Sequence, residues 1–122
     1  MMSVDSTGTL AAVIANATYD SSAGVHGLAL SSDNKFLYSA DDIGNAVWVH
    51  SVNITSGEVA KVQYLAAPTG ANPRHMVVHP KGGYAYVVFE ELSAIGVYSR
   101  DNATGELTYT NTSYSLLPSS KS

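Results

Sequence analysis

The sequence predicts an all-β protein that forms part of a β-propeller, with two four-stranded antiparallel blades in tandem. Its main feature is an ungapped repeat, because residues 26–58 superpose on residues 74–106 at an offset of 48 without any insertion. Several residue types recur at this offset, among them Tyr38 and Tyr86. A period of about 40–50 residues filled with short strands is typical of propeller blades. No segment keeps helical apolar spacing over three turns, so we expect no helix longer than about two turns.

Each copy of the repeat contains four apolar runs of strand length, separated by polar turns rich in Asn, Asp, Ser and Gly. In the first copy the strands are expected at about residues 28–31, 36–40, 46–52 and 58–64. In the second copy they are expected at about residues 76–79, 84–89, 94–99 and 106–110. These strands define two blades, at about residues 26–65 and 74–112.

The amino-terminal segment resembles the end of a further blade. Residues 4–10 are similar to residues 52–59, so they are expected to form a turn that leads into the outer strand of a preceding blade, at about residues 8–16. One blade cannot bury its own faces, and propellers typically close with about 4–8 blades. The chain therefore corresponds to about two and a half blades of a larger ring.

The composition and charge of the sequence argue against several kinds of site and binding partner. Only 13% of the residues are charged, the formal net charge is −4, and the basic residues form no cluster, so nucleic-acid binding is not expected. The absence of cysteine excludes disulfides and thiolate zinc sites. No run of about 18 apolar residues is present, so no membrane span is predicted. We expect a cytoplasmic protein, since no segment has the features of a signal peptide.

Two repeat positions carry polar groups where a propeller binds ligands. Inner strands line the central channel, so residues that enter a first strand or follow a second strand lie near one mouth of it. The offset of 48 places His26 on Arg74, and Asp42 on Glu90. Two basic groups therefore share one blade position and two carboxylates share another. His26, Arg74 and Glu90 are the candidate site residues.

Simpler interpretations of these residues stay open. His26 could be a structural histidine that bonds a loop carbonyl, Arg74 a solvated cation, and Glu90 part of a hydrated strand end. Residues 41–42 precede a Gly-Asn pair and are typical of a turn. The other histidines are scattered and have no neighbours at ligand spacing, so no metal site is predicted.

Three stretches carry a resemblance to a known family. Residues 26–50, 67–91 and 110–118 resemble the fungal 3-carboxy-cis,cis-muconate lactonizing enzymes, also called carboxy-cis,cis-muconate cyclases. These are seven-bladed propellers of the same broad superfamily as bacterial 6-phosphogluconolactonase. The likeness runs from about residue 24 to residue 118, and residues 39–42 and 72–75 are its specific segments.

The resemblance implies an activity and a site. It implies a cycloisomerase that converts 3-carboxy-cis,cis-muconate to 3-carboxymuconolactone in aromatic catabolism, with a small polycarboxylate substrate and no metal or organic cofactor. The family's candidate catalytic histidine, arginine and glutamate fall on His26, Arg74 and Glu90. A further arginine of the family, from a later blade, has no counterpart here. The chain alone is therefore expected to be inactive, and a homo-oligomeric parent is left open.

The chemistry fits these residue types. The Arg74 guanidinium suits a carboxylate, because its planar fork binds both oxygens and keeps its proton. Glu90 would have to be protonated to act as the acid, and His26 is the competing proton donor or an anchor for another carboxylate.

Two other functions stay open. A lactonase-type hydrolase of a phosphorylated sugar lactone predicts a basic phosphate cradle, for which the local sequence offers Arg74 alone. A non-catalytic binding propeller predicts that His26, Arg74 and Glu90 do not converge.

Overall fold

The computed structural model describes residues 1–119, which contain ten β-strands and no α-helix. All the strands lie in antiparallel sheets, which confirms the predicted all-β class. The strands are β1 (Met2–Val4), β2 (Leu10–Val13), β3 (Val25–Leu30), β4 (Phe36–Asp41), β5 (Ala46–Val52), β6 (Val59–Ala66), β7 (Pro73–Val78), β8 (Tyr84–Phe89), β9 (Ala94–Arg100) and β10 (Leu107–Ser115).

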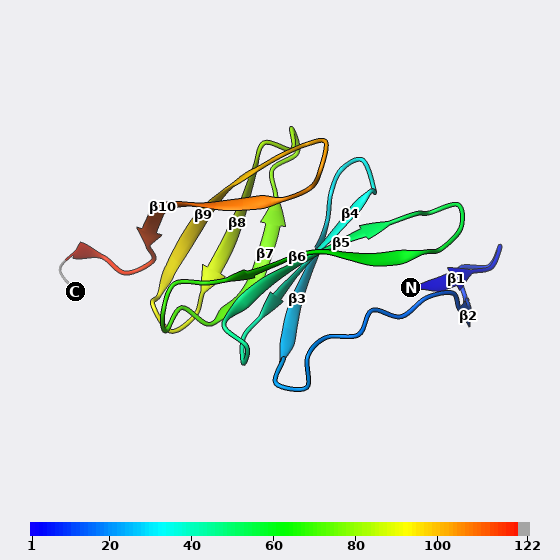
Figure 1. Cartoon of the computed structure of the whole chain (residues 1–122), viewed down its shortest axis with the longest axis horizontal. Coiled ribbons are helices and arrows are strands. Elements are labelled where there is room, and N and C mark those ends of the chain that lie inside the picture. Colours follow the sequence, from blue (N-terminus) through cyan, green and yellow to red (C-terminus); the bar gives the residue numbers. More distant parts are fainter. Residues whose placement is uncertain (120–122) are drawn as a thin grey trace.

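Eight of these strands form two four-stranded sheets in which chain neighbours are also sheet neighbours. We call the sheet β3-β4-β5-β6 blade 1 and the sheet β7-β8-β9-β10 blade 2. Their innermost strands, β3 and β7, lie against each other (Figure 1). This arrangement places the start of each inner strand at the same end of the two blades.

A short hairpin stands at the amino-terminal end. Strands β1 and β2 pair only with each other, as a separate two-stranded sheet, and Figure 1 shows them at the opposite end of the molecule from the carboxyl terminus. β2 falls within the expected outer strand of a preceding blade. β1 was not predicted, because its three residues carry no alternating pattern of their own.

The structure extends several strands beyond the predicted bounds. The inner strands begin at Val25 and Pro73, three residues before the predicted starts at 28 and 76. β10 continues to Ser115 rather than 110, across an irregularity between Tyr109 and Thr112 where Asn111 has a φ of 60°. In each case pairing with a neighbouring strand prolongs the element past its apolar run.

The hydrophobic core lies between the two blades. Side chains alternate along each strand, so one face of β4 and β5 meets one face of β8 and β9. The buried members are Phe36, Tyr38, Ala40, Val47, Val49, Ala67, Ala71, Met76, Ala85, Val87, Phe89, Tyr98 and Leu107. The contact between blades is therefore an apolar interface of the kind that joins blades around a ring.

One buried polar cluster crosses this interface. The Tyr38 hydroxyl donates a 2.7 Å hydrogen bond to the carbonyl of Gly105 and accepts one of 2.5 Å from Nε of Arg100. Burial raises the pKa of the Tyr38 hydroxyl, although the neighbouring Arg100 opposes the shift. The guanidinium of Arg100 also lies 5.6 Å from the ring centres of Phe36 and Tyr38. These contacts fix the register of blade 1 against blade 2.

Candidate functional site

His26 and Arg74 occupy matching β-bulges. The pairing of β3 with β4 shifts register between Val25 and Gly27, and that of β7 with β8 shifts between Pro73 and His75. In each blade the intervening residue, His26 or Arg74, is the extra one and has no partner across the ladder. Bulges re-aim a side chain and occur often beside binding sites. The same type of β-bulge thus positions both basic side chains.

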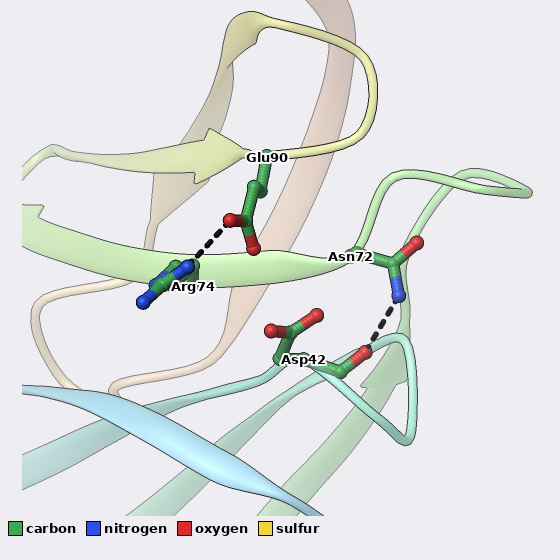
Figure 2. Close-up of polar contacts among 4 residues, drawn as sticks. All are labelled: Asp42, Asn72, Arg74 and Glu90. Carbon is green, nitrogen blue, oxygen red and sulfur yellow. Dashed lines mark hydrogen bonds and ion pairs between the residues drawn. The ribbon is translucent and has the colours of Figure 1, made fainter.

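Arg74 is paired with Glu90. Nη1 of Arg74 lies 2.5 Å from Oε1 of Glu90, and Figure 2 shows the two side chains meeting at the end of β8. Their side chains are 40% and 38% exposed. An ion pair this exposed adds only about 0–1 kcal/mol to stability. The pair is therefore accessible to a ligand and is not needed to hold the fold.

His26 stands on the neighbouring blade. Its exposed ring packs edge-on against His75, with centroids 4.9 Å apart and planes at 89°. Among residues 1–119, no hydrogen bond joins His26 to Arg74 or Glu90. The structure thus brings Arg74 and Glu90 into contact and places His26 beside the residue that follows Arg74.

The inner strands approach closely at this level. A Cβ atom added to Gly27 would lie 2.4 Å from the carbonyl oxygen of Arg74. Only a residue without a side chain lets β3 come this near to β7. Gly27 therefore sets how close the bulge that carries His26 lies to the bulge that carries Arg74.

Asn72 links blade 1 to the ion pair. Its Nδ2 donates to the carbonyl of Asp42 at 2.9 Å (Figure 2). Its backbone N–H donates to Oδ1 of Asn45 at 2.8 Å. Its own carbonyl accepts the N–H of Glu90 at 3.1 Å. The backbone of Asn72 is left-handed, with a φ of 54°. Asn72 thus holds both Glu90 and the loop after β4 in place.

Sequence analysis missed the role of Asn72. The signal available was the residue type, because asparagine adopts the left-handed conformation more readily than most other residues. The repeat gave no signal, since Gly24, 48 positions earlier, does not have a left-handed backbone. The equivalent hydrogen bond recurs in blade 1, where Asp42 donates its N–H to the carbonyl of Gly24 at 3.1 Å.

The two acidic residues after β4 have different roles. Asp41 is 1% exposed, and its carboxylate accepts hydrogen bonds from the N–H groups of Gly24 and Gly44 and from Nε1 of Trp48. It is a structural residue of the turn. Figure 2 shows the Asp42 carboxylate on the same side of the blades as the ion pair of Arg74 and Glu90.

The described residues contain no group of three or more His, Asp or Glu side chains placed to hold a metal ion. Within the same range, the structure has no helix of the length and apolarity that a membrane crossing requires.

Two meander sheets packed face to face, with polar groups at the starts of their inner strands, define the chain as a section of a β-propeller. The family model described as "Lactonase, 7-bladed beta-propeller" matches residues 4–121, and the chain belongs to this family.

Relatives of known name agree with this assignment. The chain is 37% identical over 119 residues to carboxy-cis,cis-muconate cyclase of Neurospora crassa, covering 97% of the chain and 32% of the relative. It is 33% identical over 93 residues to 6-phosphogluconolactonase of Bacillus subtilis, covering 76% of the chain and 24% of the relative. The chain thus spans a third or less of the length of these relatives.

Solved structures share the fold. A crystal structure of a protein from Lactobacillus plantarum superposes with a TM-score of 0.83 at 25% identity, covering 97% of this chain and 36% of that one. Together with the family match, this confirms the predicted resemblance and the partial propeller.

Proposed function

We propose that the complete protein is a lactonizing cycloisomerase of 3-carboxy-cis,cis-muconate, and that these two blades supply part of its active site. The observation that carries the proposal is the half-exposed ion pair of Arg74 with Glu90, held at a bulge beside the inner strands. The 37% identity to muconate cyclase over nearly the whole chain supports it.

Arg74 is suited to bind the substrate carboxylate on which charge develops. Lactonization adds one substrate carboxylate oxygen across a conjugated double bond, which pushes the electron pair toward a second carboxylate as an enolate. A guanidinium already in place stabilises that charge as it forms. Only Nη1 of Arg74 is used by Glu90, so the rest of its fork is available to a second carboxylate.

Glu90 is suited to deliver the proton that completes the reaction. A substrate carboxylate bound to the remaining N–H groups of Arg74 brings negative charge close to Glu90, and Glu90 takes up a proton from solvent as the substrate binds. The enolate carbon then takes that proton, and the net reaction is an isomerisation. His26 is the alternative donor, or binds another substrate carboxylate.

The test is a comparison of two substrates on the purified full-length protein. We expect 3-carboxy-cis,cis-muconate to be converted, with loss of its conjugated-diene absorbance, and 6-phosphogluconolactone to be hydrolysed no faster than in buffer. The opposite result would replace this proposal with the hydrolase. We expect the 122-residue chain alone to be inactive in both assays.

A 6-phosphogluconolactonase-like hydrolase is the second candidate, because bacterial relatives of that name are 33% to 46% identical to parts of the chain. Phosphate recognition uses several cations or backbone N–H groups. Among residues 1–119, the cation in contact with Glu90 is Arg74. A single guanidinium favours a carboxylate ligand over a phosphate.

A further inference from the structure

One residue of blade 1 holds both ends of the segment that connects the two blades. This connecting segment, residues 67–72, leaves β6 and enters β7. Nδ2 of Asn45 donates to the carbonyl of Pro68 at 3.0 Å, and Oδ1 of Asn45 accepts the N–H of Asn72 at 2.8 Å. The carbonyl of Asn45 accepts the N–H of Ala67 at 2.9 Å. Asn45, just before β5, thus fixes the path of the connecting segment.

The connecting segment in turn fixes the backbone of both members of the ion pair. The carbonyl of Asn72 accepts the N–H of Glu90 at 3.1 Å. Only Pro73 stands between Asn72 and Arg74, and this proline is fully buried and has a φ fixed by its ring. A displacement of Asn72 would therefore move the backbones of Arg74 and Glu90 together.

The backbone conformation of Asn45 does not by itself require an asparagine. Asn45 is left-handed, with a φ of 51°, and Ser93, its counterpart at the offset of 48, has a φ of 46°. The carbonyl of Ser93 accepts the N–H of Leu116 at 2.8 Å, as that of Asn45 accepts Ala67. The turn therefore also forms with a serine. What the amide of Asn45 adds is a donor and an acceptor on one short, partly buried side chain, and both are used.

The proposed reaction depends on the placement of Glu90 more than on that of Arg74. Reacting atoms must approach to about 3–3.5 Å, and a misplacement of about 1 Å can lower a rate by about 100-fold. The guanidinium of Arg74 stands at the end of a long, flexible side chain and can follow a bound carboxylate when its backbone shifts. Glu90 has a shorter side chain, and its own N–H is the group bonded to Asn72. A loosened connecting segment therefore affects proton delivery more than substrate binding.

We propose that Asn45 is a positioning residue for the lactonization, because it holds Asn72 and through it places Glu90 for proton delivery. This inference rests on the roles proposed above for Arg74 and Glu90. Asn45 acts through the backbone of the neighbouring blade and takes no part in the chemistry itself. Its loss should lower turnover and leave substrate binding nearly unchanged.

The test compares two asparagine-to-glycine substitutions in the complete protein. Asn45→Gly keeps the left-handed backbone and the carbonyl bond to Ala67, and it removes the amide. Asn34→Gly is the matched control, because Asn34 is also left-handed, with a φ of 61°, and its exposed side chain lies in the turn after β3, at the other end of the blade. Steady-state kinetics with 3-carboxymuconate and amide hydrogen exchange are the two measurements.

We expect Asn45→Gly to lower kcat by about 10- to 100-fold and to change KM by less than about threefold. The amide of Asn72 loses its acceptor in this variant, so the amides of Asn72 and Glu90 should exchange about tenfold faster or more. Asn34→Gly should match the wild type in both measurements.

An unchanged kcat in Asn45→Gly, a KM that rises as much as kcat falls, or equal effects of the two substitutions would overturn the proposal. If the wild-type protein does not convert 3-carboxymuconate, the proposed reaction fails and hydrogen exchange decides on the link alone. Faster exchange at Asn72 and Glu90 in Asn45→Gly then supports the link, and unchanged exchange overturns it. Asn45→Ser, which introduces the residue type found at this position of blade 2, repeats the test if Asn45→Gly fails to fold.

Discussion

The backbone of Arg74 is held in a defined position, while its side chain is still accessible to a ligand. A bulge in β7 directs its side chain, Asn72 anchors the turn before it, and the pair with Glu90 is still half exposed. A ligand therefore finds a guanidinium whose backbone is fixed and whose partner is exchangeable. The planar fork is the property that the proposed reaction uses, because it binds both oxygens of a carboxylate.

Arg74→Lys in the complete protein tests the need for that fork. The charge is kept but the two-point contact is lost, so we expect kcat/KM for 3-carboxymuconate to fall by about 10- to 100-fold, the effect of a charged hydrogen bond. Steady-state kinetics measure this, with Lys81→Arg in the turn after β7 as the reciprocal control. An unchanged kcat/KM in Arg74→Lys would exclude the assigned role.

Glu90→Gln separates proton delivery from binding. The amide still forms hydrogen bonds but donates no acidic proton, so kcat should fall more than KM rises. The decrease expected for loss of a general acid is about 10²- to 10⁴-fold. Turnover at the wild-type rate would transfer the donor role to His26, which His26→Gln then checks in the same assay.

The candidate site lies on β3 and β7. These two strands approach each other closely at Gly27, because glycine places no side chain between them. This contact is specific to the inner strands, and both contain a bulge at the same blade position. An added methyl group at Gly27 would push against the Arg74 carbonyl. The position of Arg74 thus depends on a glycine in the neighbouring blade.

Gly27→Ala should move β3 away from β7 in the complete protein. We expect a loss of about 1–3 kcal/mol in stability, as for other overpacked sites, and a lower kcat. Thermal unfolding and steady-state kinetics measure the two effects. Gly83→Ala is the matched control, since a Cβ there meets no atom within 4 Å, and it should change stability by no more than about 1 kcal/mol. Equal effects of the two substitutions would refute the close-approach argument.

The hydroxyl of Tyr38 joins blade 1 to blade 2, because it forms hydrogen bonds with Gly105 and Arg100. Tyr38→Phe leaves the Gly105 carbonyl and Nε of Arg100 buried without this partner, at a cost of about 1–3 kcal/mol. Amide hydrogen exchange in β4 and β8 of the 122-residue chain should therefore accelerate about tenfold or more. Tyr86→Phe, at the same repeat position in blade 2, is the matched control and should have little effect. If both variants exchange alike, the hydroxyl does not join the blades.

The 122-residue chain contains one complete interface between blades, and the outer faces of both blades keep exposed apolar side chains. Repeat architectures gain stability from contacts between neighbours, and end units without a polar outer face limit solubility. The exposed apolar side chains at both ends, such as Leu28 and Tyr84, are the direct consequence.

We therefore expect the isolated chain to associate, or to melt gradually without a sharp transition. Differential scanning calorimetry of the chain and of the complete protein measures the contrast, because a closed ring pairs every blade and should unfold cooperatively. A sharp, reversible two-state melt from a monomeric chain would contradict this expectation.

Local features of the sequence were enough to predict the architecture. Apolar runs of strand length, turn residues between them and the offset of 48 residues identified the two blades and placed His26 on Arg74. These signals are local because side-chain alternation and turn propensity act over a few neighbouring residues. The roles of His26, Arg74 and Glu90 in catalysis stay predictions.

Contacts between distant residues required the folded molecule. The early start of β3 and β7, the ion pair of Arg74 with Glu90, the Asn72 link to Asp42 and the pairing of Tyr38 with Arg100 all depend on how strands and sheets pack. Tyr38 and Arg100 are 62 positions apart, and no local pattern marks them as partners. Bulges arise when two strands pair, and close approaches and hydrogen bonds between blades arise when two sheets pack, because each needs the geometry of both partners.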